Sequence, residues 1–132
     1  MWETVGCAKM QVMKRTIFAL LVARPGPLKD GLRALLTAIP QIDTVGQVRD
    51  LSAAPVVAAE FQPRLVIVDG GWPRLDLAAL LREIQAVAPG TRSIVLAQDV
   101  PQQAAAQAAG ADAVLLIGSF ADELAYTVEQ LV

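Results

Sequence analysis

The sequence predicts an α/β protein with a doubly wound parallel sheet of five strands, each followed by a helix. Short apolar runs alternate with longer stretches in which apolar residues recur every three or four positions. The run between Arg64 and Asp69 is apolar on both faces, which is typical of a central strand in a parallel sheet. The 132 residues, 55% of them hydrophobic, suit one compact domain with a single core.

The first part of this pattern contains three strands and two helices. We expect strands over residues 16–22, 42–48 and 64–69, and helices over residues 28–39 and 51–61. Pro40 stops the first helix, whereas Pro55 is tolerated near the start of the second. The strand over residues 42–48 is partly polar, which favours a position at the edge of the sheet.

The second part contains two strands and three helices. We expect helices over residues 75–87, 102–109 and 119–132, and strands over residues 93–97 and 112–117. Gly110 suits the C-terminal cap of the short Ala-rich helix, and Ser119 suits the N-terminal cap of the last helix. Right-handed crossovers between the strands would place helices on both faces of the sheet.

Composition excludes several classes of function. The chain has no His and only one Cys, Cys7, which excludes Ser-His-Asp catalysis, His-based metal sites and an intrachain disulfide. A lone thiol is consistent with a reducing, cytoplasmic location. The 11 Lys and Arg residues are scattered, which argues against nucleic-acid binding, and no apolar run is long enough to span a membrane.

The N-terminal residues 1–14 show no clean periodicity and are interpreted as a loose extension or a misassigned start, with Met10 or Met13 as alternative initiators. Basic residues followed by the first apolar run also resemble a short signal peptide. The run fits the repeating pattern better as a buried strand. We therefore assign the domain to residues 15–132.

Asp69 is the leading candidate for a functional residue. It ends the predicted central strand and precedes Gly70 and Gly71, at the carboxyl edge of the sheet where α/β folds place their chemistry. A carboxylate there could accept a phosphoryl group if a metal and a cation were beside it. The two glycines lack the spacing of a phosphate-binding loop, and no acid–base pair converges, so we expect neither a nucleotide site nor an enzyme.

Several segments occur in the order and spacing of one known family. They are Leu20-Leu21-Val22 followed by Lys29–Leu36, Val45-Gly46, Pro63–Asp69 with Pro73, and Gly110–Leu116. From about residue 16 to 132 the chain resembles the receiver domains of two-component response regulators, especially the NarL type. The resemblance implies a CheY-like, flavodoxin-like (βα)5 fold with strand order 2-1-3-4-5, and it places Asp69 at the phosphoacceptor position.

The chain departs from this family at the other positions that carry its chemistry. Ala23 and Arg24 stand where the family has the acidic pair that binds Mg²⁺. Ala97 replaces the hydroxyl residue and Val114 the aromatic switch residue. Ile117 replaces the lysine. The segment between Ala97 and Gly110 is about two residues short, which implies a displaced or abbreviated fourth helix. Of the family's chemical groups only Asp69 remains, so we expect no metal site and no catalytic residues.

Arg24 offers a replacement for the missing cations. Its guanidinium could reach Asp69 and form a two-point ion pair that fixes the first strand–helix loop in one state. The alternatives are that Arg24 points into solvent, and that Asp69 only caps the turn at Gly70 and Gly71. Trp72 either contacts a partner or, as we favour, folds over the sheet end and covers the vacated pocket.

Other candidates have structural interpretations. Asp76 is interpreted as a helix cap and Asp112 as a turn residue. We expect the alanines of the fourth helix to pack in the core. These are Ala104, Ala105, Ala106, Ala108 and Ala109. Alternatively they let another chain approach, since in receivers the fourth helix, fifth strand and fifth helix often form a dimer surface.

We therefore expect an atypical receiver, or pseudo-receiver, that acts in signal transduction by docking on a protein partner or by pairing with itself. It would need no cofactor and no phosphorylation. In the first alternative, Asp69 still accepts phosphate from a histidine kinase with the help of Mg²⁺. In the second, the crevice at the strand ends binds a small ligand.

Overall fold

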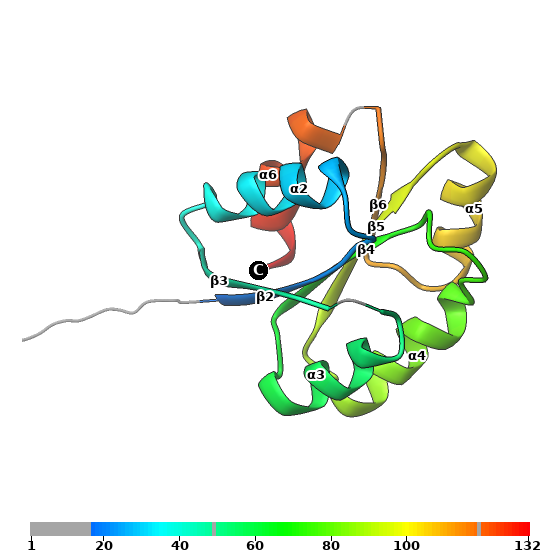
Figure 1. Ribbon diagram of the computed structural model, residues 1–132, viewed down its shortest axis with the longest axis horizontal. Helices are drawn as coiled ribbons and strands as arrows, with labels where there is room; N and C mark the ends of the chain where they lie inside the picture. Colours follow the sequence, from blue (N-terminus) through cyan, green and yellow to red (C-terminus); the bar gives the residue numbers. More distant parts are fainter. Residues whose placement is uncertain (1–16, 49, 119) are drawn as a thin grey trace, which may run out of the picture.

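A computed structural model describes residues 17–48, 50–118 and 120–132 of the chain. Within these residues, parallel strands form one sheet in the order β3-β2-β4-β5-β6 (Figure 1). The strands are β2 (Ile17–Val22), β3 (Ile42–Gln47), β4 (Leu65–Asp69), β5 (Arg92–Ala97) and β6 (Ala113–Leu116). Counted along the chain, this is the order 2-1-3-4-5, so the predicted doubly wound fold is confirmed.

Each strand is followed by a helix, and the helices cover both faces of the sheet (Figure 1). They are α2 (Pro27–Thr37), α3 (Ala53–Phe61), α4 (Leu77–Val87), α5 (Val100–Ala108) and α6 (Phe120–Leu131). Helices α2 and α6 lie on one face, and α3, α4 and α5 lie on the other. Among the described helices, none combines the length and the apolar character that a membrane crossing requires.

The core consists of two apolar layers, one on each side of the sheet. Leu32 and Leu36 of α2 pack with Leu124 of α6 on the first face. Leu80 and Ile84 of α4 pack against the second face together with small residues of α3 and α5. All residues of β4 are buried, which confirms the predicted central strand, and partly polar β3 lies at an edge of the sheet as expected.

Helices α3, α4 and α5 each begin two residues from the predicted start, and a capping aspartate accounts for the starts of α4 and α5. Helix α4 begins at Leu77, where residue 75 was expected, because the Asp76 carboxylate accepts the N–H of Ala79 at 3.1 Å. Helix α5 begins two residues before the predicted 102, because the Asp99 carboxylate accepts the N–H of Gln102 at 2.9 Å. The predicted N-terminal extension and the Ser119 cap lie outside the described residues.

The prediction that the α5 alanines pack in the core is wrong for most of them. Ala106 is fully buried, whereas Ala104, Ala105 and Ala108 are exposed and Ala109 is half-buried. The nine-residue helix contacts the sheet mainly through β5 and β6, at the edge. A short helix at a sheet edge buries only a narrow stripe, so an Ala-rich sequence gives no guide to which alanines it covers.

Candidate functional site

Asp69 lies at the carboxyl end of the central strand and is almost completely buried. It ends β4, where it pairs in register with Leu96 of β5, and 1% of its surface is exposed. The neighbouring strand β2 ends at Val22, which pairs with Val68. The chain order reverses between these two strands, so the loop after β2 opens at the point where doubly wound sheets bind ligands.

Both oxygens of the Asp69 carboxylate accept hydrogen bonds from the protein. Oδ1 accepts the backbone N–H of Gly71 at 2.8 Å. Oδ2 accepts Nε–H of Arg24 at 3.0 Å and, at the limit of a hydrogen bond, the backbone N–H of Arg24 at 3.5 Å. The buried carboxylate is therefore neutralised by a guanidinium whose own side chain is 43% exposed.

The ion pair differs from the predicted two-point geometry. Of the side-chain nitrogens of Arg24, Nε alone lies within hydrogen-bond distance of the carboxylate, and the N–H of Gly71 occupies Oδ1. The tip of the guanidinium instead lies against Gly71. A Cβ added there would overlap Nη2 of Arg24 and would lie 2.8 Å from its Cζ. The absence of a side chain at residue 71 is thus what makes room for the guanidinium.

A second polar contact, which the sequence did not reveal, closes the β5–α5 loop beside the β4–α4 loop. Oε1 of Gln102 accepts the backbone N–H of Gln98 at 2.8 Å. The same oxygen would lie 2.6 Å from a Cβ added at Gly70, whose N–H donates to the carbonyl of Leu96 at 2.9 Å. The aspartate before Val100 and Pro101 signals the start of a helix, and this signal could have identified Gln102 as a residue of its first turn.

Trp72 covers the same end of the sheet. Its indole N–H donates to the carbonyl of Val22 at 3.1 Å, and its ring packs against the apolar layer beneath α3 and α4. Of the two orientations considered from the sequence, the structure shows the one in which Trp72 folds over the sheet. The indole therefore covers the carboxyl end of β2 on the face of the sheet that carries α3 and α4.

The remaining candidate positions carry hydrocarbon side chains. Ala23 and Ala97 are fully buried, Val114 is half-buried in the apolar layer of α3 and α4, and Ile117 is half-buried. The backbone N–H of Ile117 donates to the carbonyl of Ala97 at 2.9 Å. These positions therefore offer no hydroxyl, ammonium or carboxylate to a phosphoryl group.

The aspartates proposed as structural residues lie away from Asp69. Asp76 caps α4, as described above. Asp112 accepts the backbone N–H of Ser93 at 2.8 Å and thereby joins the starts of β5 and β6 at the opposite edge of the sheet. Within the described ranges, no three His, Cys, Asp or Glu side chains gather as a metal site would require.

These residues do not fit Mg²⁺. The ion prefers an octahedral shell of oxygen ligands and is held in proteins by one or two carboxylates with water. Here one carboxylate is present, both of its oxygens are engaged, and a guanidinium occupies the adjoining space. The open space beside the pair, a cavity of about 220 Å³, is lined by Arg24, Asp69 and residues 25–28, which add no second carboxylate.

Comparison with known proteins finds solved structures that share this fold. No family model and no curated protein match the sequence. Solved structures do match. A LuxR-family two-component response regulator from Aurantimonas sp. SI85-9A1 has 22% identity and a TM-score of 0.76, over 87% of this chain and 84% of that one.

Two further structures are similar to the same extent. The response regulator domain of Thermotoga maritima CheB has 22% identity and a TM-score of 0.75, over 89% of this chain and 96% of that one. The signal receiver domain of NarL from Mycobacterium tuberculosis has 20% identity and a TM-score of 0.75, with the same shares covered. These neighbours are response-regulator receiver domains, and the chain has their fold.

Proposed function

We propose that this chain, which has the receiver fold, is an atypical receiver that acts in signal transduction through contacts with another protein and without phosphorylation of Asp69. The fold supports the receiver assignment. Action without phosphorylation is supported by one observation: both carboxylate oxygens of Asp69 accept hydrogen bonds from donors of the chain itself. The proposal includes no catalytic activity and no cofactor.

Phosphorylation would require this arrangement to be taken apart. Phosphoryl transfer to a carboxylate depends mostly on positioning and on neutralisation of the charges that repel. An attacking oxygen of Asp69 must be freed from Gly71 or Arg24, and a divalent cation must replace a guanidinium that repels it. The side chains at residues 97 and 117 contribute no group that would stabilise the product.

The same features favour a single default conformation. The Arg24–Asp69 pair fixes the loop after β2, and Gln102 fixes the loop after β5. Residue 114 is valine and residue 97 is alanine, so neither position supplies an aromatic ring or a hydroxyl that could link the site to a distant face. A domain built in this way would present one constant surface to its partner.

Beryllofluoride with Mg²⁺, a mimic of the phosphoryl group, tests this proposal. We expect amide NMR spectra of the unaltered chain to show no saturable shifts around Asp69. The matched variant restores the missing groups through Ala23→Asp, Arg24→Asp, Ala97→Thr and Ile117→Lys, and its folding is checked by circular dichroism. Saturable shifts in the restored variant alone support the proposal. Saturable shifts in the unaltered chain overturn it.

One observation favours the phosphorelay alternative. Arg24 is 43% exposed and holds Asp69 through a single side-chain nitrogen, so it could swing away and leave an oxygen free. In that case a small phosphodonor such as acetyl phosphate, supplied with Mg²⁺, would add one phosphoryl group that is lost in Asp69→Asn. Intact-mass spectrometry distinguishes this outcome from the unmodified chain that we expect.

The proposed contact surface comprises α5, β6 and α6, where a protein partner or a second copy would bind. The surface includes an edge strand of the sheet, and Val100 and Tyr126 are 64% and 67% exposed. If a second copy binds there, Val100→Asp will lower the mass measured by light scattering. Val56→Asp, at an equally exposed valine of α3, is the matched control.

A further inference from the structure

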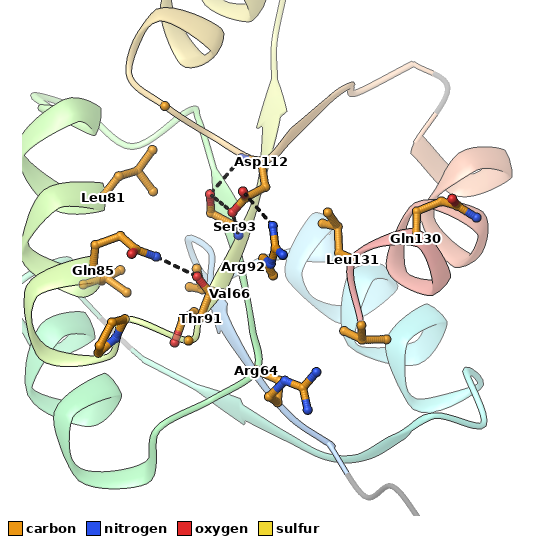
Figure 2. A pocket seen from close by; sticks show the side chains of 15 residues that line it. Arg64, Val66, Leu81, Gln85, Thr91, Arg92, Ser93, Asp112, Gln130 and Leu131 are labelled. Atoms are coloured by element: carbon orange, nitrogen blue, oxygen red, sulfur yellow. Dashed lines mark hydrogen bonds and ion pairs between the residues drawn. The ribbon is translucent and has the colours of Figure 1, made fainter.

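A cavity of about 810 Å³ lies at the edge of the sheet opposite Asp69, where β4, β5 and β6 begin (Figure 2). Its volume falls in the range of about 300–1,000 Å³ that is usual for small-molecule sites. It is separate from the site described above, so what it binds does not depend on the function proposed for Asp69.

The floor of this cavity is polar and already satisfied by internal hydrogen bonds. The Thr91 hydroxyl is buried and donates to the carbonyl of Pro63 at 2.6 Å. The backbone N–H and the hydroxyl of Ser93 both donate to Oδ2 of Asp112, at 2.8 and 3.4 Å. These contacts hold the floor rigid, and they also engage most of the only carboxylate side chain in the lining.

Two arginines approach this floor from adjacent strands. The backbone N–H of Arg92 donates to the carbonyl of Arg64 at 2.9 Å, which places the two residues side by side. Figure 2 shows both guanidinium groups on the side of the cavity that faces Leu131 at the end of α6. The carbonyl of Thr91 accepts the side-chain amide of Gln85 at 2.8 Å on the other side.

The charges of the two arginines are only partly compensated. Nη1 of Arg92 lies 3.5 Å from Oδ1 of Asp112, which is a long contact. Arg64 has no acidic side chain within ion-pair distance among the described residues. Two guanidinium groups thus face one carboxylate side chain, and the other negative group of the lining, the α-carboxylate of Val132, lies within ion-pair distance of neither arginine.

We infer that this cavity binds a small anion that carries at least two negative charges on carboxylate or phosphate groups. A guanidinium presents a planar set of donors that matches such oxygens in two-point hydrogen bonds. An anion in this cavity would give Arg64 the acidic partner that it lacks among the described side chains, and the partly enclosed walls would strengthen the attraction.

Titration followed by amide NMR tests this inference on the full chain. Inorganic phosphate is the probe in one arm and citrate in the other, both at constant ionic strength set with sodium chloride. We expect saturable shifts at the amides of Arg92, Ser93 and Asp112 with at least one of the two probes. Arg64→Gln and Arg92→Gln should each weaken binding at least tenfold, whereas Arg33→Gln on α2 should leave it unchanged.

Three outcomes would overturn the inference. The shifts could grow linearly with both probes without saturation, they could persist in Arg64→Gln, or they could weaken equally in Arg33→Gln, which would indicate general charge attraction. Saturation with phosphate but not citrate would assign the site to phosphate groups, and the reverse would assign it to carboxylates. Circular dichroism of each variant establishes that the fold is retained.

Discussion

Nε of Arg24 lies 3.0 Å from Oδ2 of Asp69, although 45 residues of sequence separate the two. The pair joins the loop after β2 to the end of β4, on either side of the position where the chain order of the sheet reverses. It places a fixed cation beside the only acidic group of the candidate site. The contribution of this pair to the free energy of unfolding therefore tests most directly whether it stabilises the site.

Removing the cation should destabilise the fold. Arg24→Ala leaves a buried carboxylate with only backbone donors, and we expect a loss of about 1–2 kcal/mol in the free energy of unfolding. The loss should be smaller than for a fully buried pair because Arg24 is 43% exposed. Urea denaturation measures it, with Arg33→Ala on the exposed face of α2 as a control expected within about 0.5 kcal/mol.

A double-mutant cycle separates the ion pair from general effects of truncating Arg24. In an Asp69→Asn background the carboxylate charge is absent, so Arg24→Ala should cost less than in the unaltered chain. Equal costs in the two backgrounds would show that Arg24 contributes packing and not charge.

A side chain at residue 71 should displace the Arg24 guanidinium. A Cβ there would overlap the Arg24 guanidinium and would approach Nε2 of Gln98 to 3.0 Å. The overlapped atoms belong to flexible side chains that can shift, so we expect Gly71→Ala to lower the free energy of unfolding by no more than Arg24→Ala does, about 1–2 kcal/mol. Gly90→Ala is the matched control, because nothing lies within 4 Å of a Cβ added there.

Making Gly71→Ala in an Arg24→Ala background tests whether the overlap with the arginine causes the loss of stability. Combined with Arg24→Ala, the Gly71→Ala cost should shrink, because the largest overlap is with the arginine side chain. An undiminished cost would place the conflict in the backbone of the β4–α4 loop.

The fold could be predicted from the sequence because it depends on periodicities. Buried strands of a parallel sheet and amphipathic helices leave distinct patterns, and these alone gave the order of elements. The juxtaposition of Arg24 and Asp69 could also be anticipated, since both follow strands whose carboxyl ends meet at one edge. The fixed positions of Gly71 and Gln102 could not, because they depend on loop conformations that leave no pattern in the sequence.

Gly31 is a position where substitution should stabilise the protein. It lies inside α2, and nothing lies within 4 Å of a Cβ added there. Alanine restricts the unfolded chain more than glycine, so we expect Gly31→Ala to raise the free energy of unfolding by about 0.5–1 kcal/mol. Gly26→Ala should have the opposite sign, because Gly26 begins the helix at a φ of 139°. Thermal denaturation of both variants measures the difference.

Asp50 should make the stability depend on acidic pH. The hydroxyl of Ser52, and next the backbone N–H of Ala53, hold the pKa of the Asp50 carboxyl below its ordinary value. A pKa that is lower in the folded chain stabilises the fold above the unfolded pKa. This contribution is lost as the pH falls through the folded pKa, in the range below about pH 4.

Ser52→Ala tests whether the Ser52 hydroxyl lowers the pKa of Asp50. Ser52→Ala removes the largest cause of the lowered pKa, so an NMR titration of the Asp50 carboxyl should show a higher pKa than in the unaltered chain. The stability lost between neutral and acidic pH should decrease in parallel. An unchanged Asp50 pKa would assign the effect to the backbone donor of Ala53.

Gln102 should hold the β5–α5 loop without contributing much to global stability. Its Oε1 accepts the N–H of Gln98 at 2.8 Å, and this bond closes the loop that leads from Ala97 to α5. Gln102→Ala removes the acceptor, so the Gln98 amide should exchange its hydrogen at least tenfold faster. The midpoint of urea unfolding should change little, because local opening of a loop costs less free energy than global unfolding. Gln107→Ala, at an exposed glutamine of the same helix, should leave the Gln98 exchange rate unchanged. Equal acceleration in both variants would show that α5 loosens as a whole, and that Gln102 has no specific role in closing the β5–α5 loop.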